Sequence, residues 1–352
     1  MKILFCGLGG IGQRHLRNLK ALLGGDMEIH AYRVRGHHTK LDSTMKVEAG
    51  ANLEHDYNIT VHQDLANGLA AAPDAVFICN PNSLHMAVAL ECARAGVAIF
   101  MEKPVASNLE GAEELLQLTR DKNLLFYVGY NFRFHPGLNR IKELLDQKRF
   151  GNIISVQAEI GEYLPNWHPY EDYRQMYAAR SDQGGGVILS QIHEMDLIYW
   201  FFGLPETILC RGGKLSKLEI DVEDTASSLM QYKNVGGGFP ISLHQDFIQR
   251  PPTRRFKIAG DAGGVEIDLI RTQLRVYDGE GALVESSDFE GFTRNDMFMS
   301  QAKHFLDCLA GRATPEVELY DGLQSLRLAL AAKQSLESGT EIILKDFGTN
   351  VS

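Results

Sequence analysis

The sequence lacks the features that mark secreted, membrane-spanning and nucleic-acid-binding proteins. Its five cysteines lie far apart and form no Cys-x-x-Cys pair, so neither a disulfide framework nor a zinc site is predicted. No apolar run approaches the roughly 18 residues of a membrane span, and no basic segment followed by an apolar core indicates a signal peptide. The formal net charge of −10 argues against nucleic acid or an anionic membrane as a partner. We therefore expect a cytoplasmic protein with buried free thiols and without a bound metal.

The length and the residue pattern indicate two domains. At 352 residues, 44% of them hydrophobic, the chain is long for one domain and can fill two cores. Over residues 1–128, short apolar runs alternate with amphipathic helical runs, which predicts an α/β Rossmann domain with a parallel, doubly wound sheet. Over residues 129–352, strand runs of period two, such as Ile154 to Ile160, are joined by short turns, which predicts an α+β domain with antiparallel pairing. Turns are expected at 234–236, 261–264 and 278–281.

A glycine pattern near the start of the chain indicates a dinucleotide site. Residues 2–6 form an apolar run typical of a buried strand, residues 13–23 form an amphipathic helical run, and Gly7, Gly9 and Gly12 lie between them. In such a G-x-G-x-x-G turn the first glycine permits the turn, the second lets backbone approach a pyrophosphate, and the third lets the helix pack closely. The helix N-terminus then offers free N–H groups to the phosphates. We expect the cofactor to contact Gly7, Gly9, Gly10, Ile11 and Gly12.

The end of the second expected strand bears on the choice of cofactor. Folds that bind NAD commonly place an acidic residue about 20 positions beyond the glycines, on the ribose hydroxyls. Here that position is Arg33, with Arg35, His37 and His38 close behind it. Because a guanidinium pairs with a 2′-phosphate and a carboxylate repels it, the sequence favours NADP over NAD. The alternatives are a solvated basic loop and an arginine that stacks on adenine.

Lys103 is the first candidate for the chemistry. It follows an apolar strand run at the carboxyl edge of the sheet, where ligands bind, and it stands between Glu102 and Pro104. A lysine shielded beside nicotinamide can donate a hydrogen bond to a substrate oxygen or relay its proton. Glu102 can hold the ammonium group, and Pro104 fixes the local backbone. The alternative is an ordinary surface lysine after a strand.

His193 is the second candidate. It follows the glycines at 184–186, and if the chain is helical from about Val187, then Ser190, His193 and Asp196 lie on one helix face. An imidazole and a carboxylate on one face suit acid–base chemistry. A metal site needs more ligands than this segment supplies. The alternative is a buried, hydrogen-bonded histidine near a helix start.

A third candidate is the aromatic segment around Trp167, His168 and Tyr173. Aromatic faces combined with hydrogen-bonding groups suit a sugar ring, which is polar at its edges and apolar on its faces. The same composition suits a dimer interface. The sequence does not separate these two interpretations.

Three of these motifs together resemble those of the Gfo/Idh/MocA family, the relatives of glucose–fructose oxidoreductase and inositol dehydrogenase. They are the N-terminal glycines, the tripeptide Glu102-Lys103-Pro104, and the three glycines followed by His193-x-x-Asp196. The segment Asn131-Phe132-Arg133 is similar to the family's connection between its two domains. The resemblance covers essentially the whole chain. It implies a Rossmann domain followed by an α+β domain with a large, open, mostly antiparallel sheet.

The resemblance also implies roles for individual residues. Lys103 corresponds to the catalytic lysine and His193 to the acid–base histidine, with Glu102 beside them. The nicotinamide end is expected to be lined by Asn80, Asn82, His85, Glu102 and Lys103. The substrate is expected to meet Lys103, Asn131, Arg133, Trp167, His168, Tyr173, Ser190 and His193.

One departure from the family pattern concerns Ser190. Many members carry an aspartate one turn before the histidine, where this chain has a serine that cannot hold imidazolium by charge. Either Lys103 and His193 handle the proton without a carboxylate, or Glu194 or Asp196 replaces it.

These features predict an NAD(P)-dependent oxidoreductase that interconverts a hydroxyl and a ketone on a sugar, activated sugar or cyclitol. The segment from Tyr173 to Asp196 is similar to a subgroup linked to surface-polysaccharide and nonulosonic-acid sugars, which implies an activated or acylated amino sugar. The alternatives are an enzyme of this scaffold with internally recycled NAD, as in some glycosidases, and a protein that senses dinucleotide or sugar. We expect a homo-oligomer, dimer or tetramer, formed through the second-domain sheet.

Overall fold

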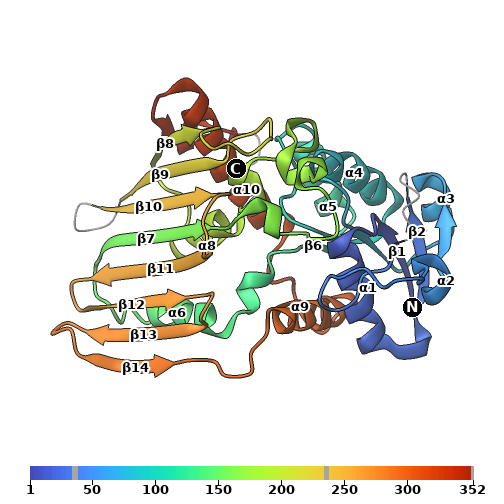
Figure 1. Ribbon diagram of the computed structural model, residues 1–352, viewed down its shortest axis with the longest axis horizontal. Helices are drawn as coiled ribbons and strands as arrows, with labels where there is room; N and C mark the ends of the chain where they lie inside the picture. The colour runs from blue at the N-terminus through green and yellow to red at the C-terminus, as the bar shows by residue number, and fades with distance from the viewer. Residues whose placement is uncertain (34–38, 234–237, 350–352) are drawn as a thin grey trace.

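The first part of the chain forms a six-stranded parallel sheet. The computed structural model describes residues 1–33, 39–233 and 238–349. Figure 1 shows this sheet on the right of the view, in the part of the molecule that holds the N-terminus. The strand order is β3-β2-β1-β4-β5-β6, which reverses direction between β1 and β4. Ligands in such sheets bind where the order reverses, at the carboxyl ends of the strands. The strands are β1 (Lys2–Cys6), β2 (Glu28–Tyr32), β3 (Thr60–His62), β4 (Ala75–Ile78), β5 (Ala98–Met101) and β6 (Phe126–Val128).

Helices cover both faces of this sheet, which explains its apolar strands. All four residues of β4 are buried, as a parallel strand requires when it is covered on both faces. Phe77 and Phe100 stack across neighbouring strands with ring centroids 4.6 Å apart. The helices of this half are α1 (Gly10–Leu23), α2 (Leu53–Tyr57), α3 (Leu65–Ala70), α4 (His85–Ala95) and α5 (Ala112–Asp121).

One further helix on this sheet comes from late in the chain. Helix α9 (Arg294–Leu309) follows the second sheet in sequence, but its Phe305 packs edge-on against the rings of Phe77, Phe100 and Tyr127. The first sheet therefore takes part of its cover from residues beyond 129. The division of the chain between residues 128 and 129 stays a prediction.

The second half of the molecule is a nine-stranded mixed sheet. The strand order is β14-β13-β12-β11-β7-β10-β9-β8-β15, and all neighbours are antiparallel except β7 and β10. This agrees with the mostly antiparallel sheet that was expected, although the sequence analysis did not identify β14 and β15. The expected turn at 234–236 lies outside the described residues. The strands are β7 (Ile153–Gly161), β8 (Thr207–Gly213), β9 (Thr225–Tyr232), β10 (Phe239–Asp246), β11 (Thr253–Gly260), β12 (Gly263–Asp268), β13 (Gln273–Asp278), β14 (Leu283–Ser287) and β15 (Ile342–Ile343).

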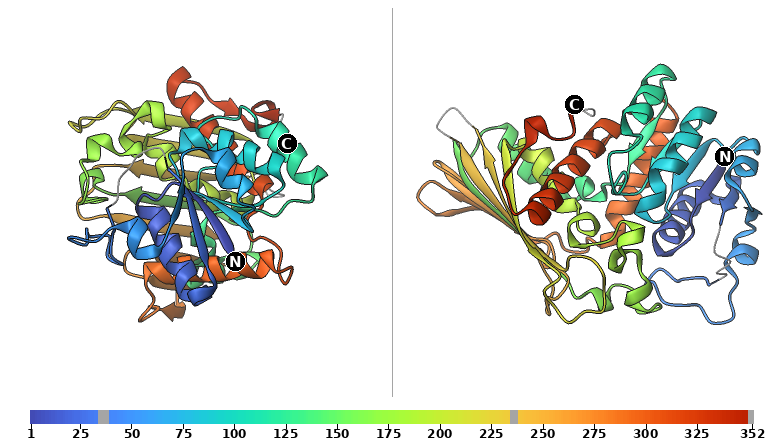
Figure 2. Two further views of the ribbon diagram at one scale, coloured as in Figure 1. Left: turned by 90° about the vertical axis from the view of Figure 1, so that its right-hand side faces the viewer. Right: turned by 90° about the horizontal axis from the view of Figure 1, so that it is seen from above.

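Helices cover only one face of the second sheet. The right-hand view of Figure 2 shows α10 (Leu319–Ser338) on the side that faces the first domain and no helix on the opposite side. Val156, Ala158 and Ile160 of β7 are buried as predicted, but Ile154 is 56% exposed, which corrects the expectation that it faces the core. Leu229 of β9 is also exposed, but most of its outward neighbours are polar. The remaining helices are α6 (Pro136–Asp146), α7 (Val187–Ser190) and α8 (His193–Phe202).

Three further expectations concern thiols, membranes and metals. All five cysteines are buried and none forms a disulfide. Within residues 1–33, 39–233 and 238–349, no helix is long and apolar enough to cross a membrane. In the same residues, no three His, Cys, Asp or Glu side chains gather as metal ligands.

Candidate active site

The glycine turn has the geometry that its sequence pattern predicts. Gly7 has a φ of +99°, and a Cβ there would lie 2.8 Å from the backbone nitrogen of Asn80. A Cβ at Gly12 would lie 2.4 Å from the carbonyl oxygen of Gly7, so only glycine lets α1 approach β1. By contrast, a Cβ at Gly9 would meet nothing within 4 Å, and no side chain caps the N-terminus of α1. This uncovered backbone and the free N–H groups fit a dinucleotide phosphate.

A loop from the second half reaches over the same turn. A Cβ at Gly10 would lie 2.5 Å from the hydroxyl oxygen of Tyr170 and equally close to the Met45 methyl group. Tyr170 belongs to the aromatic segment that follows β7. Residues on both sides of the molecule therefore border the proposed cofactor site, while Ile11 of α1 is half-buried beside them.

Three loops meet at the end where the nicotinamide is expected. Asn82, after β4, donates from its side-chain nitrogen to the carbonyl oxygen of Gly184 at 3.0 Å. The two ring nitrogens of His85 lie 2.8 Å from the carbonyl oxygen of Asn80 and 2.7 Å from that of Pro104. Burial lowers the pKa of His85. These contacts join the loop after β4 to the loop after β5 and to the glycine-rich segment of the second half.

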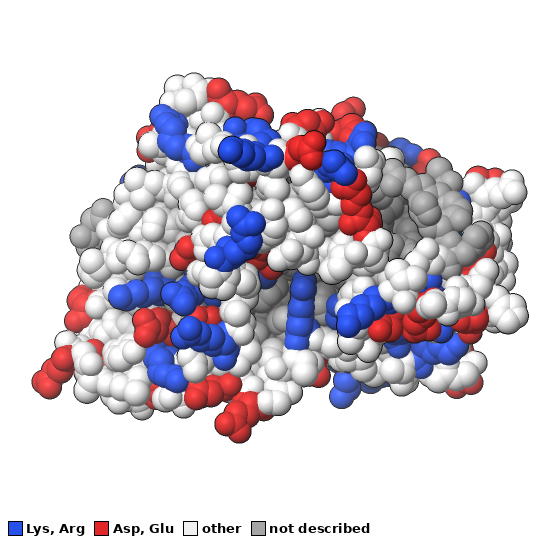
Figure 3. All heavy atoms as spheres, viewed as in Figure 1, with Lys and Arg blue, Asp and Glu red and all other residues white. Residues whose placement is uncertain are grey.

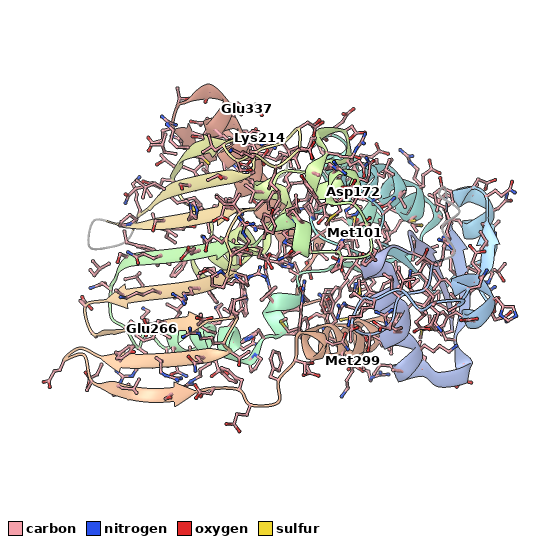
Figure 4. The ribbon with its side chains drawn as sticks, viewed as in Figure 1. Met101, Asp172, Lys214, Glu266, Met299 and Glu337 are labelled. Atoms are coloured by element: carbon pink, nitrogen blue, oxygen red, sulfur yellow. The ribbon has the colours of Figure 1, made fainter. Side chains whose placement is uncertain are left out.

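Lys103 lies at this junction. Met101, the last residue of β5, lies where the two halves of the molecule meet (Figure 4), and Lys103 is half-buried two residues further on. Its Nζ donates to the carbonyl oxygen of Ser190 at 2.9 Å, a contact between the two halves. The pKa of Lys103 is lowered to about 8, mainly by burial; the charge of Glu102 opposes this shift, and the charges of Arg254 and Arg294 add to it.

The Glu102 carboxylate is hydrogen-bonded to a histidine that the sequence analysis did not identify. The Nε2 of His15, on α1, lies 2.6 Å from Oε1 of Glu102. His15 is 1% exposed and Glu102 is 7% exposed. The imidazole packs edge-on against Phe100 with ring centroids 4.8 Å apart. The signal in the sequence that could have identified it is a histidine on the sheet-facing side of the helix that follows the glycines.

The helix expected from Val187 through Asp196 is broken, which corrects the prediction of one continuous face. Helix α7 ends at Ser190 and α8 begins at His193, so Ser190 does not stand one helical turn before His193. The break leaves the carbonyl oxygen of Ser190 available to Lys103, as the end of a helix leaves carbonyl groups unpaired. Gln191 holds the break because its side chain donates to the carbonyl oxygen of Asp246 at 3.0 Å.

His193 packs among aromatic rings as a neutral imidazole. It is half-buried, and its ring contacts Phe132 edge-on with centroids 4.9 Å apart. Burial lowers its pKa well below the usual value, and the charges of Lys103, Arg254 and Arg294 act in the same direction. Within the described residues, Nδ1 of His193 is buried without a hydrogen-bond partner.

Neither Glu194 nor Asp196 replaces the family's aspartate, because each is engaged by an arginine. Glu194 accepts from Nε of Arg254 at 2.6 Å and from Nη2 at 3.0 Å. Asp196 accepts from Nη2 of Arg133 at 2.8 Å and from Nε at 3.1 Å. The Arg133 side chain is 4% exposed, so it is not available to a substrate as the sequence analysis had expected.

The remaining residues that were expected to contact substrate have other partners. No hydrogen bond or ring contact of the described chain joins Trp167, His168 or Tyr173 to Lys103 or His193. Instead, Trp167 packs edge-on against Phe247 at 5.3 Å, His168 lies 2.7 Å from Glu171, and the hydroxyl of Tyr173 accepts from the Glu219 backbone at 3.2 Å. Asn131 is 2% exposed, and the described residues offer its side-chain nitrogen no partner.

Arg33 is already paired in this structure. Its Nη1 donates to Oε1 of Glu54 at 2.5 Å, and the Arg33 side chain is 6% exposed. Arg35, His37 and His38 lie outside the described residues. The guanidinium that would recognise the 2′-phosphate of NADP is therefore paired with the Glu54 carboxylate in this structure.

The surface between the two halves is hollowed, and basic side chains border the hollow (Figure 3). Tyr177, which follows the aromatic segment, also belongs to this region. Burial and the charge of Glu102 raise its pKa to about 12, so its hydroxyl stays protonated. The sequence analysis did not identify this residue.

Comparisons with known proteins agree with this architecture. A family model described as an oxidoreductase family with an NAD-binding Rossmann fold matches residues 1–130, and the GFO/IDH/MocA C-terminal domain matches residues 138–266. The myo-inositol 2-dehydrogenase of Thermotoga maritima is 25% identical over 98% of this chain and 99% of its own length. The inositol 2-dehydrogenase of Rhizobium meliloti is 26% identical over 78% of this chain and 81% of its own length.

Solved structures share the fold over nearly the whole chain. The WlbA dehydrogenase from Bordetella pertussis, in complex with NADH and UDP-GlcNAcA, has a TM-score of 0.78 at 22% identity and covers 97% of this chain and 98% of its own. A levoglucosan dehydrogenase in complex with NADH has a TM-score of 0.82 at 17% identity and covers 98% and 99%. The two matched family models together with this geometry show that the chain belongs to the Gfo/Idh/MocA family of NAD-binding oxidoreductases, whose members among its relatives include sugar and cyclitol dehydrogenases.

Proposed function

We propose that this protein transfers a hydride between a nicotinamide dinucleotide and a hydroxyl-bearing or keto carbon of a sugar, activated sugar or cyclitol. The observation that carries the proposal is the position of Lys103. Its amine lies at the carboxyl end of β5, beside the loops of Asn82 and His85, and contacts the second half at Ser190. When bound, the nicotinamide ring takes up or returns the hydride.

Lys103 is proposed to exchange the hydroxyl proton. With a pKa of about 8, its amine is partly neutral at neutral pH and can accept a proton from a substrate hydroxyl. In the reverse direction, the ammonium form donates that proton to the ketone oxygen. Oxidation should therefore speed up as pH rises through about 8, and reduction should slow over the same range.

His193 is proposed to orient the substrate as a hydrogen-bonding neighbour. Its lowered pKa keeps the imidazole neutral at neutral pH, so it does not act as a cation. The unpartnered Nδ1 can accept a hydrogen bond from a hydroxyl or donate one to a ketone oxygen, depending on its tautomer. Glu102 is proposed to set the charge around Lys103, held by His15. No carboxylate needs to replace the family's aspartate in this arrangement.

Two finer proposals concern the cofactor and the assembly. We propose a preference for NADP because Arg33 stands where NAD-binding folds carry an acidic residue; a 2′-phosphate would compete with Glu54 for its guanidinium. We also propose a cytoplasmic homo-oligomer formed through the outer face of the second sheet. That face exposes Ile154 and Leu229 but is otherwise largely polar, so its contacts would be mixed rather than purely apolar.

Exchange of Lys103 for methionine tests the assignment. Lys103→Met should lower the rate of NAD(P)H formation at 340 nm by about a hundredfold to ten-thousandfold, with the affinity for NADH unchanged. Lys142→Met, at a half-buried position of α6 where the lysine pairs with Asp146, is the matched control and should retain activity. Undiminished turnover in Lys103→Met would end the assignment.

The same assay separates the two alternative functions. Conversion of a sugar without a net change at 340 nm would indicate internally recycled NAD. Failure of the wild-type protein to convert any sugar or cyclitol, with dinucleotide still bound, would indicate a sensor.

A further inference from the structure

Two side chains from distant parts of the chain meet over Gly10, the first residue of α1. The methyl carbon of Met45 and the hydroxyl oxygen of Tyr170 each lie 2.5 Å from the position that a Cβ at Gly10 would take. Met45 lies between β2 and α2 in the first half, and Tyr170 follows β7 in the second half. The backbone of Gly10 is outside the left-handed region, so the turn itself does not require glycine there. The missing side chain is what leaves room for these two groups.

Met45 is held over the glycine turn in a strained backbone conformation. Its φ is +66°, a value that residues with a side chain rarely adopt and that occurs preferentially at ligand sites. The Asp42 carboxylate stabilises this turn by accepting from the backbone of Thr44 at 2.7 Å and of Lys46 at 2.9 Å. Nη2 of Arg17, on α1, donates to Sδ of Met45 at 3.7 Å. These contacts fix the thioether against the helix that follows the glycines.

Tyr170 is oriented by its neighbours but its hydroxyl has no protein partner. The ring stacks on His168 with centroids 5.2 Å apart and planes 18° apart, and Nδ1 of His168 lies 2.7 Å from the Glu171 carboxylate. Within residues 1–33, 39–233 and 238–349, the Tyr170 hydroxyl takes part in no hydrogen bond. Burial raises the pKa of Tyr170, so the hydroxyl stays protonated and can donate.

The Met45–Tyr170 pair lies beside the N–H groups that the dinucleotide phosphates are expected to use. No side chain caps the start of α1, and a Cβ at Gly9 would meet nothing within 4 Å. Phosphate oxygens that accept from these N–H groups come next to Gly10, the residue that the Tyr170 hydroxyl approaches. A hydrogen bond to a charged phosphate oxygen is stronger than one to a neutral acceptor. The hydroxyl is therefore placed to serve as a phosphate ligand.

We propose that the Tyr170 hydroxyl donates a hydrogen bond to the pyrophosphate of the bound dinucleotide, while the Met45 methyl group covers the same side as an apolar wall. The second half of the molecule then helps to retain the cofactor, in addition to the glycine turn of the first half. The inference requires the dinucleotide that the NAD-binding family implies, and it does not depend on which substrate is oxidised or reduced.

The dissociation rate of the reduced cofactor tests this proposal on the full chain without any sugar. The probe is NADH or NADPH, whichever the wild-type protein binds more tightly, and stopped-flow fluorescence follows its displacement by an excess of the oxidised form. Tyr170→Phe removes one oxygen and keeps the ring, and it should raise the dissociation rate about tenfold to a hundredfold. Tyr277→Phe, which removes a hydroxyl that donates to Glu266 at 2.9 Å on the second sheet, is the matched control and should leave the rate unchanged.

A second variant tests the same contact from the side of the helix. Gly10→Ala introduces a Cβ where the ends of Met45 and Tyr170 now lie, so both side chains must move away. The dissociation rate should rise to a similar extent. Because the contact is already lost, adding Tyr170→Phe to Gly10→Ala should change the rate by less than about threefold.

Each other outcome overturns the proposal. An unchanged dissociation rate in Tyr170→Phe would show that the hydroxyl contacts no phosphate. Slower dissociation or tighter binding in Tyr170→Phe would show that the tyrosine competes with the cofactor for the space over Gly10. Full additivity of Gly10→Ala and Tyr170→Phe would show that the two residues act separately, and a wild-type protein that binds neither NADH nor NADPH would refute the contact altogether.

These results are independent of the test on Lys103. Dissociation is measured without turnover, so a Tyr170-dependent rate in a protein that converts no sugar would leave the inference standing and end the proposed function. Turnover that requires Lys103, with the dissociation rate unchanged in Tyr170→Phe, would do the reverse.

Discussion

Removing the charge of Glu102 should shift the pH dependence of the enzyme to lower pH. A lysine with a pKa of about 8 is about one-tenth neutral at pH 7, whereas one with the ordinary value of 10.5 is neutral in only about one molecule in 3,000. The environment of Lys103 therefore raises the supply of neutral amine about 300-fold. Glu102 is the main charge that opposes this effect, since its carboxylate favours the ammonium form.

The substitution Glu102→Gln keeps the shape of the side chain and its hydrogen bond to His15 but removes the negative charge. We expect the pKa of Lys103 to fall by about one unit, which is at the low end for loss of a nearby opposite charge. The neutral fraction at pH 7 would then rise from about one-tenth to about one-half. The midpoint of kcat/KM for oxidation should move to lower pH by the same amount.

The assay is the rate of NAD(P)H formation from pH 5 to 10 with the sugar or cyclitol that the wild-type protein oxidises fastest. Glu114→Gln removes a charge from the exposed surface of α5, where Glu114 pairs with Arg94 at 2.6 Å, and serves as the control. Its midpoint should match that of the wild type. A midpoint that stays in place or rises in Glu102→Gln would refute the reasoning, because the group that titrates could not then be an amine beside Glu102.

Two further predictions concern stability and cofactor choice. Asp196→Asn should lower the free energy of unfolding by about 3 to 5 kcal/mol, because it leaves the buried Arg133 without its counter-ion. The control Asp307→Asn, at a half-buried carboxylate paired with the exposed Arg312, should cost less than about 1 kcal/mol. Urea unfolding followed by tryptophan fluorescence measures the free energy of unfolding of both variants. Equal decreases in the two would contradict a stabilising role for the Arg133–Asp196 ion pair. Arg33→Gln should weaken NADPH binding about tenfold more than NADH binding if the 2′-phosphate is recognised there. Equal effects in fluorescence titrations with the two cofactors would remove the case for NADP.

The order of helices and strands was largely predictable because most elements have strong local patterns. The apolar runs and glycines of the first half predicted the Rossmann sheet, and the period of two predicted β7 to β13 with small errors at the ends. Strand β14 (Leu283–Ser287) was missed because an exposed edge strand needs no alternating apolar residues. The parallel pairing of β7 and β10 follows from their positions in the whole sheet, which no local signal encodes.

The site was predictable where function lies in a motif and not where it depends on distant contacts. Lys103 and His193 stand in recognisable local contexts. The break between α7 and α8 was not predictable, because helical periodicity continues through it and the contacts that stabilise it come from β10. His15 acts through Glu102, which is far away in sequence, so only the folded chain shows what the imidazole faces.

The packing of α9 on the first sheet restrains how the molecule can move. The chain passes from the first half to the second after β6, returns before α9 and leaves again after it, so three connections span the boundary. A simple hinge would have to bend all three together, and Phe305 would have to leave its cage of rings if α9 followed the second half. Entry and release of ligands should therefore depend on movement of the loop that carries Tyr170 over the glycine turn. The two halves of the molecule should keep their relative position.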